Sequence, residues 1–166
     1  MKRGMKKTVI YLFLSIFLLC NMAVNVSGEE YGAMKGIKSA TAVFDERENN
    51  PKSAVLHLKL IHQTYEELVA MKKTPVFVVV FSGPSVKLIS KNREGFSPED
   101  QKSLDEIAQT ITGMSKEGIR LEICMIAAKV FGVEASSILP EIRHVPNGWI
   151  SLIGYQAKGY SLVPVY

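Results

Sequence analysis

The stretch Pro75-Val-Phe-Val-Val-Val-Phe81 is an unbroken apolar run, and the turn-forming residues Ser82-Gly83-Pro84 follow it directly. A strand without alternating polar residues has no side that suits water, so we predict that it is buried on both faces. Such strands lie at the centre of parallel sheets that carry helices on either side. The run therefore predicts an α/β protein with residues 75–81 inside the sheet.

Strand and helix patterns alternate on both sides of this run. Two of the helices carry clear start signals, since Asn50-Pro51 and Ser97-Pro98 each place an N-cap residue before a proline. We predict strands at 38–44, 75–81, 120–124, 142–145 and 160–165, with helices at 51–71, 98–117, 125–131 and 148–158 and short helical turns at 85–90 and 135–139. This order predicts a single-domain, three-layer α/β/α fold with a mostly parallel five-stranded sheet.

The chain begins with the pattern of an export signal. Four basic residues near the start precede an apolar run from Thr8 to Leu19, and small residues follow it up to Gly28. We expect a cleavable signal peptide at 1–28, a loose leader at 29–37 and the α/β domain at 38–166. The apolar run is short for a bilayer-spanning helix, although retention as an anchor stays open, and acylation of Cys20 is the weaker alternative. We therefore expect a periplasmic or secreted protein without stable membrane insertion after signal removal.

The net charge of +4 comes from the predicted signal. Residues 1–28 contain Lys2, Arg3, Lys6 and Lys7 and no acidic residue, so the remainder of the chain has as many acidic as basic residues. Because the predicted mature chain has no basic cluster with interleaved aromatic residues, we expect no nucleic-acid partner.

Cys124 is the one cysteine outside the predicted signal, so no internal disulfide is expected. It falls where the predicted strand 120–124 runs into a helix, and ligands of open parallel sheets bind beyond the carboxyl ends of strands. Free amides and the positive end of the helix dipole favour a thiolate there, which is the nucleophilic form of the side chain. The alternative is that Cys124 is a small buried apolar residue without a chemical role. Position alone leaves both interpretations open.

The remaining candidates give no second site. Zinc needs about four closely spaced nitrogen, sulfur or oxygen ligands, and the three histidines with one cysteine form no such cluster, so we expect no metal and no cofactor. We interpret the other singled-out residues as structural: His57, His62 and His144 as core or surface histidines, Asp45 and Asn49 as loop residues, Gly83-Pro84-Ser85 as a plain turn, and Trp149 as a core or subunit-contact residue.

Three stretches together resemble the DsrE/DsrF-like family of small α/β proteins, including its exported branch. They are 76–86, 118–132 and 144–160, and the resemblance extends over roughly 38–166. It implies that Cys124 accepts sulfane sulfur as a persulfide and passes it on. A partner thiol protein is expected as the sulfur donor or acceptor. It also implies a homo-oligomer, commonly a trimer or hexamer.

Two functions follow as expectations from the sequence. The first is an exported sulfur carrier or sulfurtransferase-like protein with Cys124 as the nucleophile. The second is a non-catalytic exported protein that binds a small ligand or assists assembly, with Cys124 in a packing role. Residues 31–166 carry no dinucleotide-binding glycine motif and no Gly-x-Ser-x-Gly motif, which argues against a dehydrogenase or a hydrolase.

Overall fold

The structure is a computed structural model that describes residues 31–166. The predicted signal peptide 1–28, with Cys20, lies outside the described residues. Residues 31–36 contain one short 3-10 turn, η1 (Gly32–Met34), which buries no side chain. Residues 37–166 form one compact unit, to which the description below refers.

All five strands of this unit lie in one parallel sheet. They are β1 (Ser39–Glu46), β2 (Thr74–Phe81), β3 (Arg120–Cys124), β4 (Arg143–Val145) and β5 (Ser161–Val165). Their order across the sheet is β4-β3-β2-β1-β5, which puts β2 in the middle. The predicted parallel sheet, and the central place of the run 75–81 within it, are confirmed.

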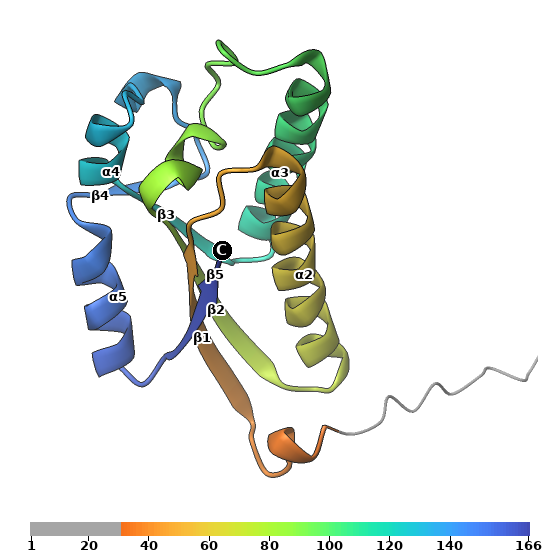
Figure 1. Cartoon of the computed structure of the whole chain (residues 1–166). Helices are drawn as coiled ribbons and strands as arrows, with labels where there is room; N and C mark the ends of the chain where they lie inside the picture. Colours follow the sequence, from red (N-terminus) through yellow and green to blue (C-terminus); the bar gives the residue numbers. More distant parts are fainter. Residues whose placement is uncertain (1–30) are drawn as a thin grey trace, which may run out of the picture. The chain divides into compact units, whose positions relative to one another are not determined.

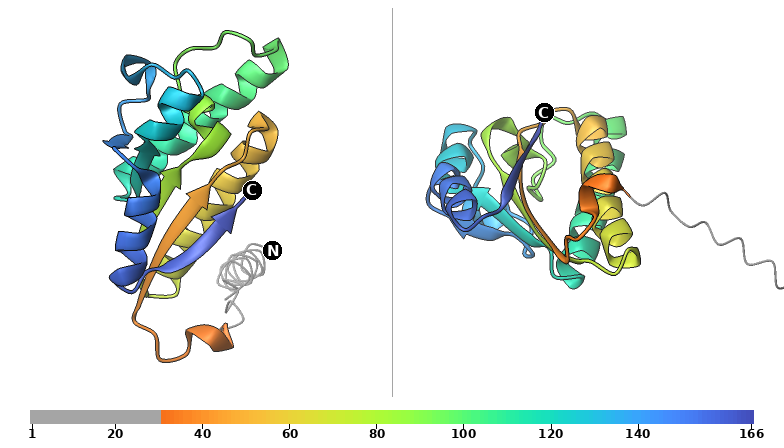
Figure 2. Two further views of the ribbon diagram at one scale, coloured as in Figure 1. Left: turned by 60° about the vertical axis from the view of Figure 1, so that its left-hand side comes forward. Right: turned by 90° about the horizontal axis from the view of Figure 1, so that it is seen from below.

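Helices cover both faces of the sheet. The helices are α2 (Pro51–Ala70), α3 (Pro98–Lys116), α4 (Met125–Val130) and α5 (Gly148–Ala157), with 3-10 turns η2 (Gly83–Lys87) and η3 (Ala135–Ser137). Figures 1 and 2 show α2 and α3 together on one side of the sheet and α5 on the other, as a three-layer α/β/α fold requires. Within residues 31–166, no helix combines the length and apolarity that a membrane crossing needs.

The two predicted helix starts form as expected. The Asn50 side-chain oxygen accepts the backbone N–H groups of Lys52 (2.9 Å) and Ser53 (3.1 Å). At the start of α3, the hydroxyl oxygen of Ser97 accepts the N–H of Asp100 at 3.1 Å. Each cap satisfies amides that have no acceptor within their own helix.

Alternate residues of β2 pack against the two helical layers. On one face, Val78 and Val80 form a buried cluster with Val43 of β1 and with Leu152 and Tyr155 of α5. On the other face, the ring of Phe77 lies 5.0 Å from that of Phe44 and 5.6 Å from that of Tyr65 of α2. Residues 77–81 of the apolar run are therefore buried on both faces, because side chains that point to opposite faces of the sheet meet different helices, whereas Val76 near the start of β2 is 41% exposed.

One carboxyl group lies in the α2 layer near the carboxyl edge of the sheet. The side chain of Glu46 is 1% exposed, and its Oε1 accepts the N–H of Glu48 at 2.8 Å. Its Oε2 lies 3.9 Å from Nδ1 of His57, and neither of these atoms has a hydrogen-bond partner. Burial disfavours the charged form and raises the pKa of Glu46 to about 7.

This buried acid predicts a pH-dependent stability. The folded-state pKa lies above the ordinary value of 4.5, so the folded chain binds a proton that the unfolded chain releases between about pH 4.5 and 7. The free energy of unfolding should therefore fall as pH rises through this window and lose nothing further above it. Glu46→Gln removes the ionisation, so its stability relative to wild type should increase by about 3 kcal/mol across the window.

Urea unfolding at pH 4.5, 6 and 7.5 measures this difference. The exposed Glu94→Gln is the matched control, for which we expect a difference from wild type that stays flat with pH. If the difference in the free energy of unfolding between Glu46→Gln and wild type is also independent of pH, the raised pKa of Glu46 is contradicted.

Candidate functional site

Three neighbouring strands place polar or sulfur-bearing side chains on the α5 side of the carboxyl edge. Because Val43, Val78 and Val80 face α5, the side chains two residues further along β1 and after β2 face the same way. These are Asp45 and Ser82, and their contact confirms the arrangement, since the Ser82 hydroxyl donates to Oδ1 of Asp45 at 2.8 Å. Cys124 ends β3 on this side, where it approaches Val80 and the start of α5.

Cys124 is buried but borders an opening. It is 6% exposed and forms the junction between β3 and α4. It lines a surface hollow of about 280 Å³ together with Arg47, Ser82, Gly83, Ile126, Ala127, Val130, Phe131, Asn147 and Trp149. The thiol is therefore recessed in the wall of a hollow rather than sealed within the core.

Two helices begin beside the sulfur. Helix α4 starts at the residue after Cys124, as the sequence predicts. Helix α5 starts at Gly148, where an added Cβ would stand 2.9 Å from Cβ and 3.5 Å from Sγ of Cys124. The sequence predicts the helix that begins at residue 148 but not its position beside Cys124, because residues 124 and 148 meet only in the folded chain. First-turn amides carry partial positive charge, so both helices place it near the sulfur.

A short hydrogen-bonded chain holds a cation in the same hollow. Asp45 is 8% exposed, and its two carboxylate oxygens have separate partners. Oδ1 accepts from the Ser82 hydroxyl and Oδ2 accepts from Nε of Arg47, each at 2.8 Å. Arg47 is the one charged side chain among the residues that line the hollow.

The structure corrects the interpretation of Asp45 as a loop residue. The predicted first strand stopped at Phe44, whereas β1 continues to Glu46. Asp45 is therefore a buried strand residue, and Asn49 is the one that lies in the loop, where its N–H donates to Glu48 Oε1 at 2.7 Å. Trp149 is not a core residue either, because it is 64% exposed at the rim of the Cys124 hollow.

The three histidines lie away from the hollow. His144 is an exposed residue of β4 in register with Ile123. His57 and His62 belong to α2, on the opposite side of the sheet. Gly83 and Ser85 belong to the turn η2, in which the Ser85 hydroxyl donates to the carbonyl of Glu46 at 2.8 Å.

A cluster on α2 and α3 was not recognised in the sequence. Ligand-capable atoms of His62, Glu66 and Glu117 lie within 4.8 Å of one another, with 2.9 Å between His62 Nε2 and Glu117 Oε1. The spacing of His62 and Glu66 on one helix face was available from the sequence, but the approach of Glu117 depends on helix packing. We interpret the cluster as a structural contact between α2 and the end of α3, since both carboxylates are on the surface.

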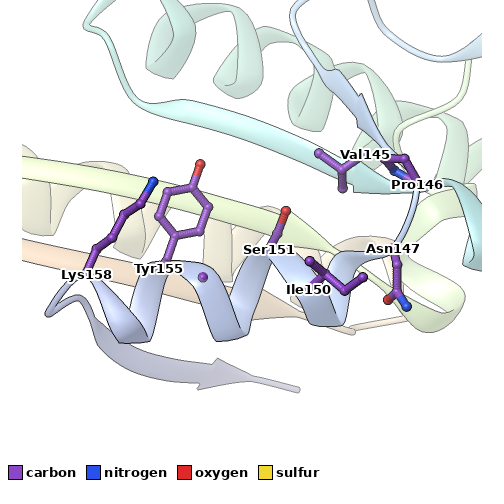
Figure 3. Close-up of a pocket in the computed structure, with 8 residues that line it drawn as sticks. Val145, Pro146, Asn147, Ile150, Ser151, Tyr155 and Lys158 are labelled. Carbon is purple, nitrogen blue, oxygen red and sulfur yellow. The ribbon is translucent and has the colours of Figure 1, made fainter.

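A second hollow, of about 330 Å³, lies between the end of β4 and α5 (Figure 3). Val145 and Pro146 line one side, and Ile150, Ser151 and Tyr155 line the side formed by α5. Its lining residues include neither a cysteine nor a carboxylate. We therefore take the hollow of Cys124 as the candidate site.

These features define a class of protein, namely an all-parallel α/β protein with one recessed thiol at the carboxyl edge of its sheet. Residues 38–165 match the model of the DsrE/DsrF-like family, and the chain belongs to this family. An uncharacterized protein from Aquifex aeolicus (strain VF5) is 28% identical over 162 residues. That match covers 96% of this chain and 64% of the relative, so the chain spans about two thirds of the relative's length.

Solved structures share the fold at low sequence identity. The protein of unknown function MTH1491 from Methanobacterium thermoautotrophicum matches with a TM-score of 0.60 and 14% identity, over 75% of this chain and 98% of that one. The ychN protein from E. coli matches with a TM-score of 0.57 and 9% identity, over 76% and 99% of the two chains. At this level of identity, the likeness concerns the fold alone.

Gly148 provides a direct test of the packing around Cys124. Gly148→Ala would add a Cβ 2.9 Å from the Cys124 Cβ and 3.3 Å from Cγ1 of Val80. We expect this overpacking to lower the free energy of unfolding by about 1–3 kcal/mol. Gly154→Ala, in the same helix with no atom within 4 Å of the new Cβ, should instead stabilise the chain by about 0.5–1 kcal/mol.

Thermal or urea unfolding of the two variants measures this contrast. If both substitutions change the free energy of unfolding equally, the start of α5 does not pack tightly against Cys124.

Proposed function

We propose that this protein is an exported sulfur carrier that forms a persulfide on Cys124. The observation that carries the proposal is the recessed position of Cys124 in an open hollow, next to the first residues of α4 and α5. Membership in the DsrE/DsrF-like family agrees with it. Export rests on the signal-like pattern of residues 1–28.

The chemistry requires a nucleophilic sulfur and a place for negative charge. The Cys124 thiolate attacks a sulfane sulfur, and the bond that breaks leaves its electron pair on the departing group. The product is a persulfide whose terminal sulfur carries a negative charge. Backbone amides at the starts of α4 and α5 are suited to stabilise that charge.

Delivery of the sulfur requires a second molecule. Among residues 31–166, Cys124 is the one cysteine, so the persulfide has no thiol in the same domain with which to form a disulfide. A thiol on a partner protein therefore acts as the acceptor in the proposed relay.

The alternative is a non-catalytic exported binding or assembly protein in which Cys124 only packs. The low exposure of the side chain and its tight contact with Gly148 favour this second function. The two functions differ in whether the folded protein reacts at sulfur.

Intact mass spectrometry separates them. After treatment of the folded protein with polysulfide or thiosulfate, we expect a gain of one sulfur atom that is absent in Cys124→Ser. The same samples should show alkylation of Cys124 by a small thiol reagent. If wild type gains no sulfur and Cys124 resists alkylation until the protein is unfolded, the packing function is correct.

We further propose that the protein self-associates, as the family resemblance implies. Trp149, Ile150 and Ile153 on α5 are each more than 60% exposed. We call these three residues the apolar face of α5. Exposed apolar side chains that gather on one helix mark sites of association, because their contact removes apolar surface from water.

Ile153→Asp tests the use of this face. We expect wild type to sediment as an oligomer, for which a trimer or hexamer is the prediction, and Ile153→Asp to shift towards the monomer because a charge would enter the interface. Leu56→Asp on α2, where Leu56 is 56% exposed, is the control and should leave the assembly unchanged. A wild-type chain that is monomeric at all concentrations would contradict the proposal.

A further inference from the structure

We propose that Arg47 makes the hollow selective for small anionic sulfane-sulfur donors, of which thiosulfate is the simplest. This inference rests on the proposed persulfide chemistry of Cys124 and adds the class of donor to it. It depends on three observations: how Arg47 is held, which N–H groups of its guanidinium are free to bind a ligand, and how far Cys124 is recessed.

Arg47 is held at both its main chain and its side chain. Its backbone N–H donates to the carbonyl of Val165 at the end of β5, at 2.9 Å. Its Nε donates to Asp45, whose other oxygen is taken by the Ser82 hydroxyl. Because Asp45 is itself buried, the carboxylate has a defined position, and the guanidinium is oriented before any ligand arrives.

Most of the guanidinium remains available to a ligand. Arginine presents five N–H donors, and the contact with Asp45 uses the one on Nε. Within residues 31–166, the terminal NH2 groups of Arg47 donate to no protein acceptor. A planar pair of donors of this kind matches the oxygens of a sulfonate or similar anion.

The reaction needs a cation at this place. A thiolate that attacks an anionic donor brings two negative charges together, and their repulsion is strong where water is scarce. Ile126, Val130 and Trp149 are apolar residues of the lining, so none of them offsets this repulsion. The positive charge of Arg47 offsets the repulsion.

The recess of Cys124 favours a small donor. The side chain is 6% exposed, and the hollow of about 280 Å³ accommodates a small anion. Once the persulfide forms, its terminal sulfur stands one S–S bond, about 2.0 Å, further out than Sγ. The acceptor thiol can thus meet a sulfur that is more accessible than the one that received it.

The proposed step balances with thiosulfate as the donor. A bond forms between Sγ of Cys124 and the sulfane sulfur, and the S–S bond of thiosulfate breaks. The electron pair of the broken bond leaves on sulfite, and the charge of −3 on thiolate plus thiosulfate equals that on persulfide plus sulfite. No oxidant or reductant is required.

Two alkylating reagents of the same size and different charge test the selectivity. The rate constants of Cys124 with anionic iodoacetate and with neutral iodoacetamide are measured on the folded, full protein. Arg47→Gln should lower the iodoacetate rate, relative to the iodoacetamide rate, by about tenfold. Persulfide formation from thiosulfate should fall in parallel.

Matched controls separate a local effect from a general one. Lys129→Gln removes an exposed charge from α4 outside the hollow and should leave the rate ratio unchanged. Arg47→Lys keeps the positive charge and should retain most of the wild-type ratio of the iodoacetate rate to the iodoacetamide rate. Added salt should lower the ratio in wild type, a measurement that needs no variant.

The outcomes distinguish this inference from the proposed function. If thiosulfate loads Cys124 but Arg47→Gln changes both alkylation rates equally and salt leaves the ratio unchanged, Arg47 does not select anions and only this inference fails. If Cys124 of the folded protein reacts with none of the reagents, the sulfur-carrier function fails as well.

Discussion

Burial of β2 on both faces is the constraint on which the other contacts depend. Val78 and Val80 require an apolar layer on one side, and Phe77 and Phe81 require one on the other. Helices α2 and α3 supply one layer and α5 supplies the second (Figure 1). Because α5 must lie across β1, β2 and β3 to do so, its first residue comes to rest against Cys124. The geometry of the candidate site thus follows from the packing of the core.

The carboxyl edge of the sheet concentrates buried polar groups. Asp45 and Glu46 are consecutive residues of β1, so they point to opposite faces and have different environments. Both carboxylate oxygens of Asp45 are hydrogen-bonded, whereas Oε2 of Glu46 is not. The pKa of Glu46 is raised mainly because burial removes water from the charged form, and the nearby charges of Glu48 and Asp45 add to the effect. The same strand end therefore carries an acid that anchors the cation of the hollow and another that couples stability to pH.

Proteins of low sequence identity share this fold, so the chemistry of any one of them must come from its own side chains at the site. Structures with 9–14% identity superpose on most of this chain, so the packing of the layers tolerates extensive substitution. Function on such a scaffold depends on the side chains at the carboxyl edge. Here, the proposed roles belong to Cys124 and Arg47, together with the two helix starts that flank the sulfur.

The sequence by itself determined the elements of the fold and the position of the thiol. The apolar run 75–81, the N-caps Asn50 and Ser97, and the strand that ends at Cys124 are local patterns, which can be recognised from neighbouring residues along the chain. Only the tertiary structure decided that Arg47 and Ser82 line one hollow with Cys124, and that Gly148 packs against the thiol. Two further residues of β1 beyond the predicted end turned Asp45 from a loop residue into a buried anchor. Contacts between residues so far apart in the chain depend on the strand order, on the register, and on which face of the sheet each side chain meets. A local stretch of sequence does not fix these three properties together.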